Sequence, residues 1–329
     1  MALVTAATLT STTSQAIKNR YYDELFLRQA DKKLVHKQLG QLSRKVPQGE
    51  GGYGSSHLLY WTKWVNKDII TSGSGEGVPT SALAFSALNY TGSTAQYDSA
   101  ISISDIMAYA SFGDVMKAAI ERLAYNAGLS IDTLVRNVIS TAMTQQSASA
   151  VAYWSAVPAG ANLIISEIRK AARTLQRNDA FQQDDGNWVA VAHPDSLYDL
   201  TGDSSTGGWI DANKYTEGNA TKLMTGEVGK LYGVRFLQSS NAYTRGSSYT
   251  TGSAVVASTT IYVTSVFGKD AFGISELQNL KTYIKPFGSG GVGDPTDKIA
   301  TAGWKCLFGT SVLNCAFAVN INHTVSSTA

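Results

Sequence analysis

One long stretch of helical periodicity constrains the fold of this chain more than any other feature. After Gly113, apolar residues recur at spacings of three, four and seven: Met116, Ile120, Leu123, Ala127, Leu134 and Val138. Asp114 is a good N-cap for such a helix. Each large apolar side chain that is buried contributes about 1.5 to 3 kcal/mol, so this stripe predicts a major part of the core. Gly128 could bend the helix and Ser130 could cap a second segment, because glycine costs about 1 kcal/mol in a helix interior.

Residues 55–65 predict a strand that is apolar on both faces. The large side chains alternate, with Leu58, Tyr60 and Trp64 on one face and Leu59, Trp61 and Val65 on the other. A glycine-rich turn follows, and the chain returns as a second strand near residues 97–107. An isolated hairpin is marginal in water, and exposed aromatics on both faces would make it aggregate. We therefore expect this hairpin to lie on other subunits.

The N-terminal residues 14–41 predict an amphipathic helix that is short of a core of its own. Basic residues gather in and just after it: Arg28, Lys32, Lys33, Lys37, Arg44 and Lys45. They form either a solvated face or part of an arm that lies under a neighbouring subunit.

The second half of the chain predicts a mixed region after a small-residue linker at 147–160. Helices are expected at 163–175 and 194–200, and strands at 188–192, 233–237 and 260–266. This alternation indicates a compact α/β subdomain. Three further strands, at 281–287, 302–308 and 316–321, are expected to return beside the long helix.

Length and charge exclude some classes of protein. A chain of 329 residues can form one large domain or two ordinary ones with a real core. Its charged fraction is 16% and its net charge is +2, which does not indicate a protein that binds polyanions through a broad basic field. The N-terminus lacks the basic region of a secretory signal, and no stretch approaches about 20 apolar residues. We expect a soluble protein made in a cytoplasm.

No catalytic or cofactor motif withstands inspection. The two cysteines, Cys306 and Cys315, lie in apolar runs and are expected to be small buried hydrophobes, and the four histidines are scattered. The pattern G-x-G-x-x-G occurs at Gly49-Gly51-Gly54 and at Gly288-Gly290-Gly293, but neither copy lies between a strand and a helix N-terminus. Both copies are interpreted as loop glycines.

His193, Asp195 and Ser196 could suggest a catalytic dyad with a nucleophile. No nucleophile elbow is present, however, and Pro194 favours the first position of a helix after a turn. Asp179, Asp184 and Asp185 are expected to be solvated in a polar loop, with no support for a pair of glycosidase acids. The prediction is a protein without enzymatic activity, organic cofactor or metal.

A series of short phrases resembles one known family. Residues 193–203 read HPDSLYDLTGD, 208–215 GWIDANKY, 226–236 GEVGKLYGVRF and 239–242 SSNA. The same phrases in the same order resemble the central run of tailed-phage major capsid proteins, specifically the N-four-like branch of the Hong Kong 97-type fold.

Shorter matches flank this central run. Upstream they are Glu76-Gly77-Val78-Pro79, Gln96-Tyr97 and Ser104-Asp105; downstream they are Val266-Phe267-Gly268-Lys269, Phe272-Gly273, Asp294-Pro295 and Gly303-Trp304-Lys305. Each phrase alone is weak, but together they cover most of the chain from about the N-terminal helix onward. An inserted piece at 243–260, rich in Ser, Thr and Tyr, departs from the pattern.

The resemblance implies an α+β coat subunit of the Hong Kong 97 type. Its parts would be an N-arm (1–46), an E-loop hairpin (47–101), the first part of a P-domain with a long spine helix on a β-sheet (102–158), an A-domain (159–277) and P-domain return strands (278–329). Such a subunit self-assembles into hexamers and pentamers of an icosahedral head around double-stranded DNA. It is a structural protein of the virion, assembled in the host bacterial cytoplasm without a membrane. A portal protein and scaffolding or decoration proteins are its candidate partners, and it does not bind DNA by sequence.

The residues expected at contacts between subunits are Tyr60, Trp61, Trp64, Glu76, Arg169 and Arg173. Arg169, Arg173 and Arg177, with Lys170, recur at helical spacing; they form a solvated face, pair with another subunit or face DNA. Lys63 and Lys67 lie in the E-loop, but nothing assigns them an Asn and Glu partner, so no isopeptide crosslink is predicted.

Two other classes of function stay open. The Ser, Thr, Gly and Tyr content suggests a β-rich phage fibre or another virion surface-binding protein, although fibres rarely need a helix as long as the one after Asp114. An enzyme of unfamiliar type is the third possibility. Solution scattering with electron microscopy separates closed shells, rods and small globules.

Overall fold

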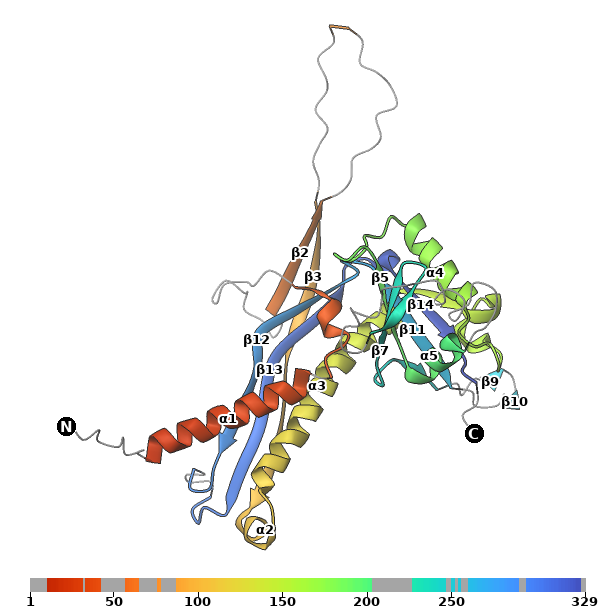
Figure 1. Ribbon diagram of the computed structural model, residues 1–329. Coiled ribbons are helices and arrows are strands. Elements are labelled where there is room, and N and C mark those ends of the chain that lie inside the picture. Colours follow the sequence, from red (N-terminus) through yellow and green to blue (C-terminus); the bar gives the residue numbers. More distant parts are fainter. Residues whose placement is uncertain are drawn as a thin grey trace, which may run out of the picture.

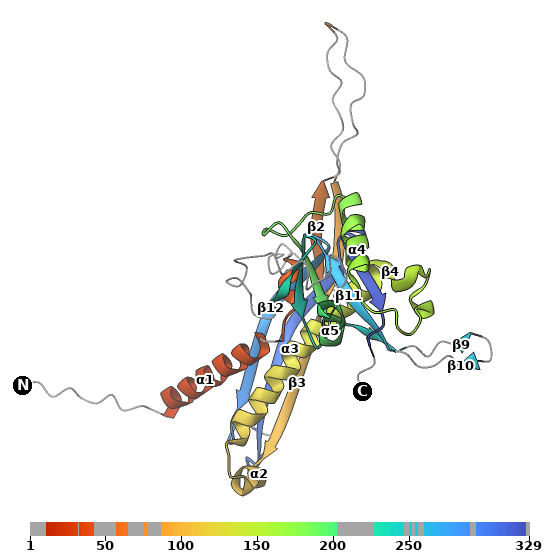
Figure 2. The ribbon, with the colours of Figure 1, turned by 45° about the vertical axis from the view of Figure 1, so that its right-hand side comes forward.

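The computed structural model shows an elongated chain in which a long helix joins two β-sheets (Figure 1). It describes residues 11–31, 33–42, 57–64, 76–77, 87–202, 227–246, 250–251, 254–255, 260–289 and 294–326. Helix α3 (Val115–Ala142) runs along the narrow half and reaches the rounder half with its C-terminal end (Figures 1 and 2).

A five-stranded sheet forms the narrow half, in the order β1-β12-β13-β3-β2. Its strands are β1 (Gln41–Leu42), β2 (His57–Trp64), β3 (Ala87–Ser104), β12 (Phe272–Lys285) and β13 (Ile299–Val312). β12, β13 and β3 are antiparallel neighbours, whereas β1 joins β12 in parallel. β2 pairs with residues 87–94 of β3 and β13 with residues 95–104, so β2 and the first part of β3 extend past the other strands as a two-stranded ribbon, with Tyr60 opposite Thr91 (Figure 1).

Helix α3 confirms the predicted long helix. The Asp114 carboxylate accepts a hydrogen bond from the backbone N–H of Lys117 at 3.1 Å, which satisfies one of the free donors of the first turn. Ile120, Leu123 and Ala127 are buried as predicted. Further along, Ile131, Val135 and Ile139 are buried at spacings of four, so the buried stripe passes one position after the expected Leu134 and Val138, which are half-buried.

Gly128 does not bend α3, which is continuous from Val115 to Ala142. Its role is a close approach instead. A Cβ atom at Gly128 would lie 2.6 Å from the carbonyl oxygen of Ala30, at the end of helix α1 (Ser11–Asp31). α1 therefore packs directly on α3, with Phe26 and Ala30 buried in the main core. The predicted N-terminal helix ends at Asp31 rather than near residue 41, and its C-terminal half belongs to the subunit's own core.

A seven-stranded sheet forms the rounder half, in the order β4-β14-β11-β5-β7-β6 with β8 paired to β11. Its strands are β4 (Thr144–Ser147), β5 (Trp188–Ala192), β6 (Glu227–Leu231), β7 (Val234–Gln238), β8 (Thr244–Arg245), β11 (Ile261–Phe267) and β14 (Ala318–His323). Helices α4 (Ile165–Arg177) and α5 (Pro194–Thr201) belong to this half. All five residues of β5 are buried, as predicted.

The remaining described elements are short. They are α2 (Asp105–Ala110), the strand pair β9 (Thr250–Thr251) and β10 (Ala254–Val255), and the 3-10 turns η1 (Lys37–Leu39), η2 (Ala148–Ala150), η3 (Trp154–Ala156) and η6 (Cys315–Phe317). β9 and β10 come from the inserted piece at 243–260 and project away from the seven-stranded sheet (Figure 2). No helix in the described part of the chain is both long and apolar enough to cross a membrane.

One strand prediction needs correction. The return strand of the hairpin begins at Ala87, and residues 105–107 are helical, because the Ser104 hydroxyl accepts from the Met107 N–H and caps α2. The last strand, expected among the return strands at 278–329 beside the long helix, pairs with β4 and β11 of the seven-stranded sheet.

Candidate functional site

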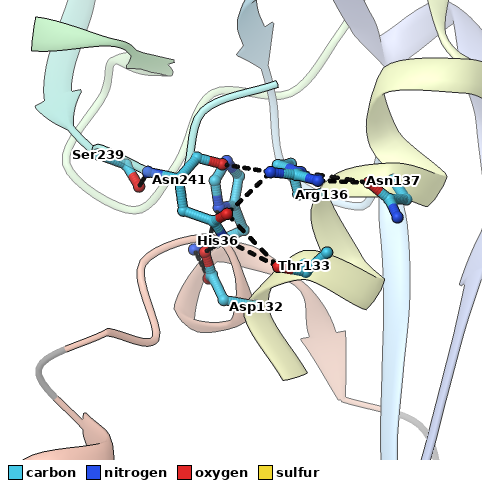
Figure 3. A network of polar contacts seen from close by, with 7 residues as sticks. All are labelled: His36, Asp132, Thr133, Arg136, Asn137, Ser239 and Asn241. Atoms are coloured by element: carbon cyan, nitrogen blue, oxygen red, sulfur yellow. Dashed lines mark hydrogen bonds and ion pairs between the residues drawn. The ribbon is translucent and has the colours of Figure 1, made fainter. Parts of the chain in front are cut away.

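A cluster of polar residues, with His36, Asp132 and Ser239 buried at its centre, holds three parts of the chain together (Figure 3). We call it the polar joint, and its members are His36, Asp132, Thr133, Arg136, Asn137, Ser239 and Asn241. His36 precedes η1, Ser239 and Asn241 follow β7, and the other four lie on α3. The joint thus connects the N-terminal segment, the long helix and the seven-stranded sheet.

Asp132 is the centre of the polar joint and is fully buried. One carboxylate oxygen accepts the backbone N–H of His36 at 2.8 Å. The other lies 2.8 Å from His36 Nδ1 and accepts the Asn241 side-chain amide at 2.9 Å. Because a carboxylate only accepts hydrogen bonds, His36 Nδ1 carries the proton in this contact.

Arg136 completes the polar joint one turn along α3. Its guanidinium donates to the Asn241 side-chain oxygen at 2.8 Å and backbone carbonyl at 3.2 Å, and to Asn137 Oδ1 at 2.9 Å. The Asn241 N–H donates to Ser239 Oγ at 3.2 Å, which holds the turn after β7. Asn241 therefore has partners for its amide, its side-chain oxygen and both backbone groups.

The charges of the polar joint stabilise one another. Burial alone would raise the pKa of the Asp132 carboxyl, but the hydrogen bonds and charge of His36 and the amide of Asn241 hold that pKa below its usual value. Burial lowers the pKa of Arg136, and the Asp132 charge opposes this effect. Asp132 and Arg136 thus have hydrogen-bond partners within the joint, and these contacts fix the geometry of the three segments.

A second contact lies at the C-terminal end of α3. Asn320 of β14 donates its amide to the carbonyls of Ile139 at 2.9 Å and Ser140 at 3.1 Å. Arg245 of β8 also donates to the Ser140 carbonyl, at 2.9 Å. The last carbonyls of a helix have no partner within it, and here the seven-stranded sheet supplies donors. The Arg245 guanidinium also lies over the Trp154 ring at 5.1 Å from its centroid.

The sequence reading missed both contacts between the halves. The SSNA phrase at 239–242 was noted, but nothing assigned a role to Asn241, which is separated by 109 positions from its partner Asp132. Buried Asp132 on an otherwise apolar helix face was the available signal, because a buried carboxylate requires partners.

The residues around His193 form a helix start, as predicted. His193 is the N-cap of α5, with its Nδ1 accepting the Asp195 N–H at 3.3 Å and Pro194 at the first helical position. The Asp195 carboxylate accepts from the Tyr262 hydroxyl at 3.1 Å, and Ser196 is buried. In the described part of the chain, no group of three His, Cys, Asp or Glu residues could hold a metal ion.

Asp179, Asp184 and Asp185 are exposed, as expected, and two of them also form ion pairs, Asp184 with Lys269 at 2.7 Å and Asp185 with Arg235 at 2.6 Å. The expectation for the cysteines needs one correction. Cys306 is buried as expected, and burial raises the pKa of its thiol to about 11, but Cys315 is exposed in η6. Of the first G-x-G-x-x-G copy nothing is described, and of the second only Gly288 lies within the described residues.

The predicted contact residues lie on three separate elements. Tyr60, Trp61 and Trp64 belong to β2, and their side chains lie outside the described part of the structure. Glu76 is exposed in a short turn. Arg169 and Arg173 are exposed one turn apart on α4, so the structure does not gather the six residues into one site.

One of the four basic residues expected on the exposed face of α4 pairs within the chain. Lys170 pairs with buried Glu167 at 2.7 Å, and Glu167 also accepts from Gln146 at 3.0 Å. Lys170 is thus bound within its own subunit. The Arg169 guanidinium lies 5.3 Å from the centroid of the Tyr232 ring, on the loop between β6 and β7.

The fold of this chain is similar to that of several solved structures. No protein-family model and no curated protein sequence matches the chain. Solved structures do match: the capsid of Ralstonia phage GP4 has a TM-score of 0.64 at 13% identity, over 84% of this chain and 86% of that one. The chain has the fold of phage capsid subunits.

Two further structures share this capsid fold. The capsid of cyanophage P-SCSP1u has a TM-score of 0.61 at 16% identity, over 89% of both chains. The mature capsid of bacteriophage PhiM1 has a TM-score of 0.59 at 12% identity, over 90% of this chain and 88% of that one. The predicted fold class, an α+β Hong Kong 97-type fold with a long helix on a sheet, is confirmed.

Proposed function

We propose that this chain is the major capsid protein of a tailed phage, which self-assembles into hexamers and pentamers of an icosahedral head around double-stranded DNA. The observation that carries the proposal is the match of nearly the whole chain, 84% to 90%, to phage capsid subunits. The phrases at 193–242 support the finer assignment to the N-four-like branch.

The shape of the subunit supports a role in assembly. The β2–β3 ribbon continues beyond the five-stranded sheet, and a two-stranded ribbon is marginal alone in water (Figure 2). Large apolar side chains are also exposed on α2 and after it, including Tyr109 and Phe112. A closed shell covers such surfaces because each subunit engages several neighbours at once, which makes modest interfaces strong together.

The parts of the chain are assigned as the family resemblance implies. Residues 1–46 are the N-arm, 47–101 the E-loop, 102–158 the first part of the P-domain with α3 as its spine, 159–277 the A-domain and 278–329 the return strands, of which β14 joins the A-domain sheet. The subunit is a structural protein of the virion, made in the host bacterial cytoplasm, with no cofactor. Its partners are other copies, a portal, and scaffolding or decoration proteins.

Particles from expressed protein test the function. Electron microscopy and solution scattering of the purified chain are expected to show closed shells of uniform size. Elongated rods would indicate a fibre instead, and monodisperse small globules at high concentration would contradict a coat function.

A loop replacement tests the E-loop assignment separately. Exchanging residues 68–79, which include exposed Glu76, for a short Gly/Ser link is expected to leave a folded helical subunit, while particle yield collapses. Circular dichroism and particle counts give the two readouts. Normal shells from this variant would show that assembly does not need the hairpin tip.

A further inference from the structure

The far end of the narrow half carries an exposed apolar tip. Helix α2 and the residues after it lie at the end of α3 that is remote from the seven-stranded sheet (Figure 1). α2 has no buried residue, and its large side chains Ile106, Met107 and Tyr109 are exposed by 75%, 55% and 89%. Phe112 follows and is fully exposed. Soluble proteins rarely leave such contiguous apolar surface uncovered unless it binds a partner.

A hollow of about 220 Å³ lies beside this exposed phenylalanine. Its lining residues are Ile103, Ala108, Gly113, Asp114, Val115, Met116 and Phe287. An apolar cavity of about 150 Å³ already holds a benzene molecule, so a phenyl ring fits this hollow. A Cβ atom added at Gly113 would meet no heavy atom within 4 Å, which shows that the space beside it is open.

Phe112 and the hollow do not satisfy each other within one subunit, because the Phe112 side chain is fully exposed. We propose that Phe112 of one copy inserts into the hollow between α2 and α3 of a second copy of this chain. The inference rests on the proposed function, which brings identical subunits together at high local concentration. The knob and the hole lie on the same tip, so two tips that meet exchange them in a two-fold contact that uses the same surface patch on both copies.

The charges at the tip favour a second copy of this chain over a nucleic acid as the partner. Three carboxylates accept backbone N–H groups of their own subunit: Asp105 from Ile106 at 2.8 Å, Asp114 from Lys117 at 3.1 Å and Asp294 from Ile299 at 2.7 Å. These three carboxylates and Asp297 carry four negative charges, and Lys117, Lys285 and Lys298 carry three positive ones, so the formal charges of the tip nearly balance. Two such tips approach without strong repulsion, whereas a phosphate backbone would meet no basic surface.

Photo-crosslinking in mixed particles tests this contact. Benzoyl-phenylalanine replaces Phe112 in unlabelled protein, which is co-assembled with nitrogen-15-labelled wild-type protein, and the crosslinked peptides are identified by mass. We expect crosslinks to the peptides that contain Met116 or Phe287, with one light and one heavy partner. Crosslinks only within one copy, or only to other regions, would overturn the tip contact while leaving the capsid function intact. A failure of wild-type protein to form any particle would overturn the proposed function itself.

Two variants attack the knob and the hole separately. Phe112→Ser removes the knob, and Gly113→Leu fills the hole; both positions are exposed, so the free subunit is expected to melt as wild type. Central aromatic contacts often contribute about 2 kcal/mol or more, so each variant is expected to lower particle yield at least tenfold. Tyr198→Ser is the matched control, because Tyr198 is an exposed aromatic of α5 in the other half. Wild-type yield from both tip variants, or an equal loss from the control, would refute the knob-and-hole contact.

Discussion

The two ends of this chain differ in whether their side chains have partners within the chain. In the polar joint and the seven-stranded sheet, the buried polar side chains Asp132 and Thr264 have partners within the chain, His36 at 2.8 Å and His323 at 3.0 Å. At the α2 tip, by contrast, large apolar side chains have no cover. The first region holds its polar contacts within the chain, whereas the second exposes the apolar surface proposed above to contact a second copy. Stability of the subunit and stability of the particle should therefore be separable by mutation.

The largest effect on the self-contained region is expected from Asp132→Ala. This change leaves the backbone N–H and ring N–H of His36 and the side-chain amide of Asn241 without their acceptor, and each buried donor left unsatisfied costs about 1 to 3 kcal/mol. Urea unfolding of free subunits measures the loss. Glu24→Ala, which removes an exposed carboxylate from α1, should change stability by no more than about 0.5 kcal/mol. Equal effects of the two variants would show that the polar joint does not hold the halves together.

Acid should destabilise the seven-stranded sheet through His323. Burial lowers the pKa of this histidine from 6.5 to about 4. Between these values the unfolded chain binds a proton that the folded chain does not, so stability is full above pH 6.5 and falls as the pH drops to about 4, by up to about 3 kcal/mol. Asp132 does not add to this window, because its pKa lies below the usual 3.8 and its contribution is lost only at lower pH.

The measurement for His323 is the free energy of unfolding at several pH values between 7 and 4. His323→Gln, which cannot titrate, should show a flatter dependence on pH than wild type. An unchanged slope would mean that another group controls the acid sensitivity of this sheet.

Substitutions in the β2–β3 ribbon should lower the stability of particles more than that of free subunits. Trp61→Ala or Trp64→Ala is expected to cost about 2 kcal/mol per contact in assembled shells, because central tryptophans are frequent hot spots, and this loss repeats at every copy. Free subunits should lose far less. Paired melting of intact particles and dissociated subunits provides the comparison. Equal losses in both would place these tryptophans in the subunit's own core and end the E-loop assignment.

The smallest effect is expected from Arg169→Ala on α4. Its contact with the Tyr232 ring is partly exposed, and such cation–π contacts contribute about 0.5 to 1 kcal/mol. The same paired melting separates two roles, since an additional loss in particles alone would support the predicted contact between subunits. Gln176→Ala, at an exposed position of the same helix, is the control. Equal melting of the Arg169→Ala and Gln176→Ala variants, in particles and in free subunits, would show that Arg169 is a solvated residue without a stabilising contact.

The sequence by itself determined those features whose causes are local. The stripe after Asp114 predicted α3 because helical periodicity shows in neighbouring residues, and Pro194 predicted the start of α5 because proline suits the first helical position. The run at 188–192 predicted a buried strand for the same kind of reason. The ordered phrases at 193–242 led to the Hong Kong 97-type fold that the solved capsids share.

Only the tertiary structure decided which distant segments meet. Gly128 predicted a bend from its intrinsic propensity, but contact with Ala30 overrides propensity and makes the glycine a point of close approach. β14 looked like any apolar strand, and its place in the second sheet depends on its partners β4 and β11. The polar joint joins residues about a hundred positions apart, so no local pattern revealed it. Periodicity reports which face of a segment is buried, whereas the partner of that face is chosen by packing of the whole chain.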